Sequence, residues 1–493
     1  MRQTLIIGAC AVVLALLYVL GQGGVLRPDE ALPVHQALTL LHEHSLDLNG
    51  VEGIAGQRLD PGKLRDLYSI EPPGTSMMIF PWIALGHGIA TLLDVDAAQS
   101  LGLAVLFARV GSALAMACAV VLIYLFMLNA NLSWRAALIA AALLAFGSHC
   151  WPLALGATKV PWVCMAVALC AFTVHRVVNG DAGVHDFLGL GAACGLFVLL
   201  DYRLIVLLPV PLLGLIVGRK KSSDQGPSWM LMLLAFVLIA LIAPGLNYLH
   251  FGSVLPPDYR ELLGDHATGL RLLFLGRGAL DPDLTQALGL GPDVRFRGLL
   301  FTTPLLLIAL LALIARFESP GRPRSAFAVA LGMLALGSLG AALFAEPWRA
   351  DGWDLGLLWP AAMPMFVLVA ALLQRTLFER SNRVLRYPVL AATAFCALVG
   401  LFETGRELIL LHLGRGRLDL PLRLIESDAP DAIRGMGLKG LVLILAGNLE
   451  GALLAVLPLI LAVALIFVTA RIADQLFAPQ FDIENYVRSR AQE

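Results

Sequence analysis

Charged residues are scarce in this chain of 493 residues. Asp, Glu, Lys and Arg together make up 14%, the formal net charge is -1, and 58% of the residues are hydrophobic. An ordinary soluble domain carries about 25% charged residues, so the composition excludes a typical water-soluble globular protein. A chain without a basic excess gives no indication of a nucleic-acid partner, and we expect none. Membrane lipids are the partner that this composition predicts.

Paired cysteine spacings are also missing from the polar segments. The seven cysteines lie within or at the edges of apolar runs, where free cysteine behaves as a small hydrophobic residue. No internal repeat of the transporter type and no long low-complexity segment is visible in the sequence. The sequence therefore gives no sign of a disulfide-stabilised external domain or of an inverted-repeat transporter.

Apolar runs of spanning length dominate the chain. About 20 residues of helix cross the roughly 30 Å of a bilayer core, and the mean hydropathy is +0.80. We expect an all-α polytopic membrane protein with about 12 transmembrane helices. The predicted helices cover residues 5–20, 75–93, 101–128, 136–150, 160–177, 187–217, 230–249, 298–315, 326–344, 355–373, 388–402 and 451–469.

One of these runs is too long for a single crossing. Residues 187–217 would form a helix of about 45 Å, so we expect a break near Asp201-Tyr202-Arg203. If the break creates two crossings, the number of crossings in another apolar segment must change to keep the first loop outside. Residues 75–106 are the segment where we expect this change.

Basic residues in short loops predict the orientation of the chain. Arginines and lysines gather near residues 219–221, 316–324 and 375–386, and such residues accumulate on the cytoplasmic side of a membrane. The longer polar segments then lie on the other side, which favours one composite external site. These segments are residues 26–74, 251–297 and 403–448.

Asp29 and Glu30 follow the first apolar run, at the place where a helix leaves the bilayer. Carboxylates there are costly unless they meet a cation, a proton or a substrate. They open a predicted surface helix that runs to about Ser45, and the positive end of a helix dipole favours acids at that position. Alternatively, Asp29 is a general base or a ligand for a divalent cation. The pattern alone leaves both interpretations open.

Isolated cations between apolar runs are a second group of candidates. Lys159 and Arg203 are each flanked by long apolar runs, so each is paired with an acid or placed to bind an anion. For Arg203 the alternatives are an ion pair with Asp201, a side chain that reaches the interface, or a phosphate contact. Arg297 is predicted at the membrane surface, where it either anchors the helix at the lipid headgroups or binds an anion. Arg109, near the start of its helix, reads as structural.

Four short motifs, in this order, carry a family resemblance. They are Pro28-Asp29-Glu30, then Tyr68-Ser69 with Pro72-Pro73-Gly74-Thr75-Ser76, then Asn247-Tyr248 with Phe251-Gly252-Ser253, and Arg297-Gly298-Leu299-Leu300. Together they resemble the polyprenyl-phosphate-sugar-dependent glycosyltransferases of the GT-C superfamily, related to aminoarabinose and protein-mannosyl transferases. The resemblance covers roughly residues 1–375. It divides the chain into a GT-C-like membrane module, residues 1–297, and a variable C-terminal transmembrane region, residues 298–493.

The resemblance implies a function and a set of site residues. It implies transfer of a sugar, with inversion, from a polyprenyl-phosphate donor to an envelope glycan, lipid or protein at the periplasmic face of a bacterial inner membrane. Asp29 and Glu30 would be catalytic, with Mg²⁺ or Mn²⁺ left open as a cofactor on Asp29. The substrate and lipid phosphate would be bound by Lys159, Arg203, Arg297, Tyr68, Asn247 and Tyr248.

Several positions depart from the family pattern. Members often carry a basic residue where Ile70-Glu71 stands, an Arg or His within residues 155–158, and Gly-Pro-Arg-Tyr at residues 356–359. Two other hypotheses therefore stay open beside the transferase. One is a transporter or flippase of lipid-linked saccharide, and the other is a catalytically silent scaffold of the same fold.

Overall fold

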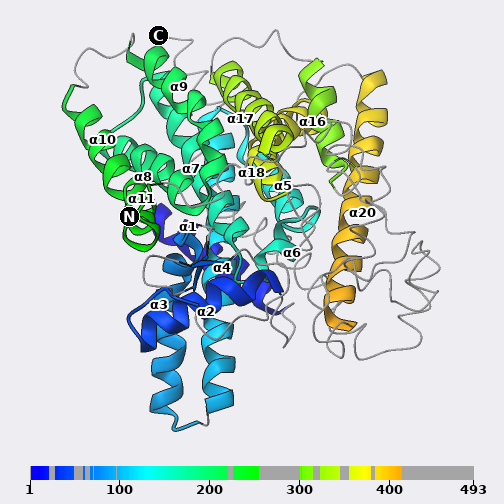
Figure 1. Ribbon diagram of the computed structural model, residues 1–493. Coiled ribbons are helices and arrows are strands. Elements are labelled where there is room, and N and C mark those ends of the chain that lie inside the picture. The colour runs from blue at the N-terminus through cyan, green and yellow to red at the C-terminus, as the bar shows by residue number, and fades with distance from the viewer. Residues whose placement is uncertain are drawn as a thin grey trace.

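The computed structural model describes residues 2–20, 28–48, 59–61, 67–69, 72–95, 97–219, 226–254, 300, 303–314, 322–344, 355–378 and 383–413. Over these residues the chain is helical (Figure 1), apart from one antiparallel hairpin. Its strands are β1 (Leu59–Pro61) and β2 (Leu67–Ser69), with Asp60 opposite Tyr68. The all-α prediction is therefore confirmed, with one short hairpin in the first loop.

The helices of the first half begin with α1 (Arg2–Leu20), the surface helix α2 (Pro28–His42), α3 (Gly74–Leu92) and α4 (Ala97–Asn129). They continue with α5 (Trp134–Phe146), α6 (Cys150–Ala154), α7 (Lys159–Asn179), α8 (Val184–Leu200), the 3-10 helix η1 (Tyr202–Leu207) and α9 (Pro209–Arg219). The predicted break at residues 201–203 is confirmed. Asp201 has an extended backbone there and caps η1 with its side chain.

The helices of the second half are interrupted more often than predicted. They are α10 (Gly226–Ala240), α11 (Ile242–Phe251), α16 (Leu305–Ile314), α17 (Arg322–Phe344), α18 (Leu355–Ala362), η2 (Met363–Met365), α19 (Phe366–Leu373), η3 (Gln374–Phe378) and α20 (Arg383–Leu413). The run 230–249 is divided at Leu241. Pro244 has no N–H to donate to the carbonyl of Ala240, so the helix ladder is interrupted there.

Six of the described helices are long and apolar enough to cross a membrane, and five more are apolar but shorter. This supports a multi-pass membrane protein. The total of about 12 crossings stays a prediction, because the expected helix 451–469 lies outside the described residues.

The ends of several helices lie at one end of the bundle. Helices α7 and α9 run parallel, because Gly214 packs against Val174 and Gly218 packs against Val177. Helix α4 ends beside them, since the ring of Phe126 lies 5.3 Å from that of His175. The start of α17 joins this end through a hydrogen bond of 3.2 Å from Ser325 to Asn179. We call it the basic end, because Arg176, Arg219, Arg324 and Arg375 belong to it.

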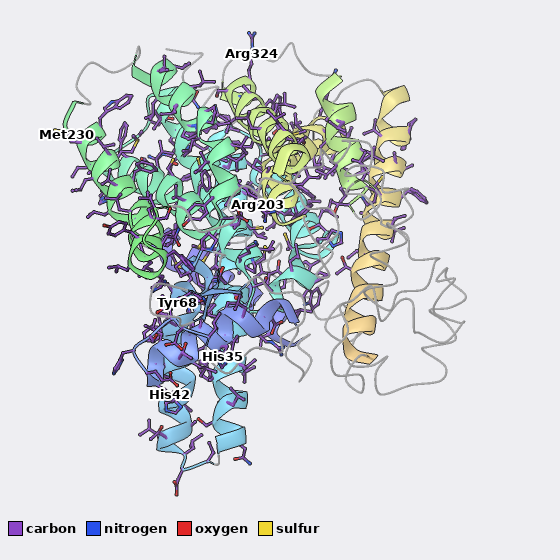
Figure 2. All side chains as sticks on the ribbon, in the orientation of Figure 1. His35, His42, Tyr68, Arg203, Met230 and Arg324 are labelled. Carbon is purple, nitrogen blue, oxygen red and sulfur yellow. The ribbon has the colours of Figure 1, made fainter. Side chains whose placement is uncertain are left out.

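The opposite end, which we call the site end, carries the predicted functional segments. It contains the start of α7, the turn between α8 and η1, and the end of α11. Figure 2 shows Arg324 projecting from the basic end, while Tyr68 and His35 lie below Arg203 and above the projecting helices at the bottom of the view. Because arginine accumulates on the cytoplasmic side, we expect the site end to face the exterior.

Helices α3 and α4 form a hairpin that projects from the site end (Figure 1). The 33 residues of α4 span about 50 Å, which exceeds a bilayer core of roughly 30 Å. Helix α3 packs antiparallel to its first half, with Gly86 against Leu103 and Ala104. Helix α3 has the length and hydropathy of a span, but it starts beside the end of α8 and runs away from the bundle. Counting α3 as external keeps the first loop outside.

Candidate functional site

Two cations meet one carboxylate at the site end. Lys159 Nζ lies 3.2 Å from Asp201 Oδ2, and Arg203 Nη2 lies 2.8 Å from the same oxygen. Arg203 Nε also donates to Asp201 Oδ1 at 3.0 Å. The Lys159 and Arg203 side chains remain 26% and 16% exposed. The ion pair considered for Arg203 is thus formed, and Lys159 joins it. We call Lys159, Asp201 and Arg203 the Asp201 cluster.

Backbone geometry places the cluster. Lys159 is the first residue of α7 and Asp201 follows the last residue of α8, so two antiparallel neighbours bring their charged ends together. Asp201 Oδ1 accepts a hydrogen bond of 3.0 Å from the backbone N–H of Arg203, which caps η1. Burying charge near apolar helices is costly unless it is paired. The cap and the two cations together fix the carboxylate at the end of α8.

The first loop reaches the cluster through α3. A Cβ atom on Gly74 would lie 2.2 Å from the carbonyl oxygen of Leu199, so only glycine permits this contact with the last turn of α8. Ser76 Oγ donates to Gln36 Oε1 at 2.7 Å and joins α3 to α2. The motif Pro72-Pro73-Gly74-Thr75-Ser76 therefore carries the first loop to the Asp201 turn.

Gly74→Ala should destabilise the protein by about 1–3 kcal/mol, as overpacking at a closed contact does. Gly88→Ala is the matched control on the same helix, because Gly88 faces open space and alanine favours a helix by about 1 kcal/mol. Thermal unfolding in lipid nanodiscs measures both variants. Equal melting temperatures for the two would contradict the proposed contact between Gly74 and Leu199.

The end of α11 contacts both the cluster and the first loop. Asn247 Nδ2 donates to Tyr202 Oη at 2.6 Å, next to Asp201 in the chain. The ring of Tyr68 stacks on His250 with centroids 4.0 Å apart and an interplanar angle of 11°. Phe251 meets the same ring edge-on at 5.9 Å. Lys159, Arg203, Tyr68 and Asn247 thus come from four segments to one end of the bundle.

Tyr248 and Arg297 are placed differently. Tyr248 is 57% exposed on the surface of α11, on another side of that helix from the buried Asn247. Arg297 and most of the predicted external segment 403–448 lie outside the described residues.

The surface helix α2 carries the predicted acids in its first turn. Asp29 is the second residue of α2, as expected, and its side chain lies outside the described part of the chain. Glu30 is fully buried. Its Oε2 atom lies 2.8 Å from Arg109 Nη2 and accepts a hydrogen bond of 2.9 Å from Arg109 Nε. The pair joins α2 to α4 directly beside Asp29.

The Glu30–Arg109 pair could not be assigned from the sequence. Arg109 read as structural, and the two residues are 79 positions apart. One signal was available, because an arginine within an apolar helix requires an anionic or polar partner. Nothing in the sequence identifies that partner as Glu30.

The described histidines of α2 do not form a metal site. Burial lowers the pKa of His35, although Glu43 and Asp47 raise it in part. Within the described residues, no group of three or more His, Cys, Asp or Glu side chains is arranged to hold a metal ion. The side chain of Asp29, the residue left open for Mg²⁺ or Mn²⁺, lies outside the described part of the chain, and we derive no step through either ion.

Comparisons with known proteins give a weak similarity. No protein-family model and no curated protein matches the sequence. Two solved structures of ArnT from Cupriavidus metallidurans, a GT-C aminoarabinose transferase, are similar to this chain. The apo structure has a TM-score of 0.44 and 14% identity, over 92% of this chain and 76% of ArnT. The structure bound to undecaprenyl phosphate has a TM-score of 0.43 and 15% identity, over 92% and 77%.

These neighbours belong to the group that the motifs resemble. Values this low carry no argument about activity, so the function rests on the residues of this chain.

Proposed function

We propose that this protein is a membrane glycosyltransferase of the GT-C type. It transfers a sugar from a polyprenyl-phosphate donor to an external glycan, lipid or protein, with inversion at the anomeric carbon. The observation that carries the proposal is the meeting of Lys159 and Arg203 at the ends of apolar helices. A lipid phosphate with its chain in the bilayer presents its headgroup at this level. Lysine and the planar guanidinium of arginine are the side chains that bind phosphate.

The residues have distinct roles in one displacement. The acceptor hydroxyl oxygen attacks the anomeric carbon while the bond from that carbon to the phosphate oxygen breaks, and the phosphate leaves with the electron pair. Asp29 takes the hydroxyl proton as general base. Lys159 and Arg203, with Arg297 from the second loop, stabilise the negative charge that develops on the phosphate. A single displacement inverts the configuration of the sugar.

Other residues hold this arrangement in place. Glu30, which the resemblance implied as catalytic, is fully buried and paired with Arg109, so we assign it instead as a positioning residue for the first turn of α2 and hence for Asp29. Asn247 holds Tyr202 beside the cluster, and the Tyr68–His250 stack holds the first loop against the end of α11. Tyr248, on the exposed side of α11, is proposed to contact the lipid chain or the acceptor at the membrane surface.

The position of the helix break favours a transferase over a flippase. A transporter places its broken helices near the bilayer midplane. Helix α8 has 17 residues and spans about 25 Å of a core of roughly 30 Å. Since α8 starts at the basic end, the break at Asp201 lies close to the opposite surface. The break is therefore suited to a headgroup reaction on one side of the membrane.

Loss of either cation tests the proposal. Lys159→Ala and Arg203→Gln should each lower the release of polyprenyl phosphate from a panel of undecaprenyl-phosphate sugars by about 10²–10³-fold, as for removal of one group that stabilises developing charge. Arg176→Gln is the control, because Arg176 pairs with Asp186 at the basic end. Its rate should equal that of the parent in proteoliposomes.

Three results would contradict the proposal. Full turnover in both cluster variants would remove the phosphate role of Lys159 and Arg203. Flipping of lipid-linked sugar by the parent with no glycosidic bond broken would favour the transporter, and no turnover of any donor would favour the silent scaffold.

A further inference from the structure

We infer that Asp201 sets the charge preference of the phosphate site. Its carboxylate disfavours the dianionic phosphate of the spent carrier relative to the monoanionic phosphodiester of the donor, and so promotes release of the product. The inference rests on the proposed function, because it assumes that the Asp201 cluster binds the lipid phosphate.

The carboxylate is fixed where it can act on a bound phosphate. Asp201 lies 3.2 Å from Lys159 Nζ and 2.8 Å from Arg203 Nη2. It also accepts the backbone N–H of Arg203 at 3.0 Å, so the cap holds the side chain independently of the cations. A phosphate that reaches both Lys159 and Arg203 must therefore lie within a few ångströms of a negative charge.

The reaction changes the charge of the ligand at this position. A phosphodiester carries one negative charge. When the bond to the anomeric carbon breaks, the electron pair stays on the phosphate oxygen, and the product is a phosphate monoester. Its second pKa is near 6, so it carries about -1.5 to -2 charges at pH 7. Repulsion by Asp201 therefore acts almost twice as strongly on the product as on the donor.

The size of this difference is measurable. One additional unit charge at about 6 Å, with an effective dielectric constant of about 20, changes a binding constant by roughly a hundredfold, and screening by salt reduces this to an expected change of about tenfold. The cap alone does not require a charged residue, because Asn, Ser and Asp are all good caps. Asn or Ser at position 201 should therefore remove the charge and keep the turn.

Binding of two probes that differ by one methyl group tests the inference. The probes are farnesyl phosphate and its methyl phosphodiester, bound to the full-length protein in nanodiscs at pH 8. Asp201→Asn should favour the monoester over the diester by about tenfold relative to the parent. Asp201→Ser should give the same shift, which guards against a fold defect of one variant. At pH 5.5 the shift should shrink, because the monoester is then largely a monoanion.

The matched control lies on the same helix. Asp186, near the start of α8, pairs with Arg176 at 3.4 Å and accepts the backbone N–H of Gly183 at 2.7 Å. Asp186→Asn repeats the substitution at the basic end and should leave the probe preference unchanged.

The outcomes separate the inference from the proposed function. If both probes bind, and binding depends on Lys159 and Arg203, an unchanged preference in the Asp201 variants overturns the inference and leaves the function standing. A shift that persists at pH 5.5 also overturns it, because a merely structural change would not follow ligand ionisation. If neither probe depends on Lys159 or Arg203, the proposed phosphate site fails and the inference fails with it.

Discussion

Asp29→Asn should insert and fold like the parent while losing about 10²–10⁴-fold in transfer from a lipid-linked donor. An amide cannot take the proton of the acceptor hydroxyl, and this range is typical of a lost general base. The fold should survive because Asn is almost isosteric with Asp and is favourable near a helix start, where α2 places residue 29. Initial rates with undecaprenyl-phosphate sugars in proteoliposomes measure the effect.

Binding provides the control for this variant. Asp29→Asn should keep the affinity of the parent for farnesyl phosphate, since phosphate binding is assigned to Lys159 and Arg203. Turnover equal to that of the parent would remove Asp29 from the mechanism. A loss of both binding and thermal stability would instead make Asp29 a structural residue of α2.

Arg109→Met should destabilise the protein by about 3–5 kcal/mol, because it leaves the buried carboxylate of Glu30 without its cation. The pair has two contacts, at 2.8 and 2.9 Å, and Glu30 is fully buried. The double variant Glu30→Gln with Arg109→Met should recover much of the loss, since replacing both partners of a buried pair is often neutral. Thermal unfolding of Glu30→Gln, Arg109→Met and the double variant in nanodiscs completes this double-mutant cycle.

An exposed arginine provides the comparison. Arg135→Met, at the basic end, removes a guanidinium that lies 5.4 Å from the Trp134 ring centroid, and should cost about 0.5–1 kcal/mol. If the double variant is less stable than Arg109→Met alone, the pair does not interact as described. Activity gives a second readout, because a rescued fold without Glu30 should still position Asp29 poorly and transfer slowly.

Several helix positions could be predicted because local physics decides them. The break at Asp201 follows from length alone, since residues 187–217 exceed one bilayer crossing. The start of α2 at Pro28 follows from the order of proline and acids. The break at Thr303-Pro304, directly before α16, and the interruption at Met363–Met365 were not predicted. In both cases a proline, Pro304 or Pro364, stands at the boundary and lacks the N–H of a regular helix.

The sequence identified several residues of the site but not the contacts between them. Lys159 and Arg203 were identifiable as cations in apolar surroundings, and Asp201 as the neighbour of Arg203. That Lys159 shares the same carboxylate depends on the antiparallel packing of α7 and α8, which no local pattern encodes. The Tyr68–His250 stack depends in the same way on β2 and the end of α11, which meet only in the folded chain.

The gathering of arginines at one end of the bundle has a consequence for biogenesis. Arg176 of α7, Arg219 of α9, Arg324 of α17 and Arg375 of η3 lie at that end, and each contributes separately to the preference for the cytoplasmic side. Direction of insertion is therefore encoded redundantly. Neutralising the arginines of any one loop should leave the others to hold the topology, so the fraction of correctly inserted chains should fall only when several loops are neutralised together.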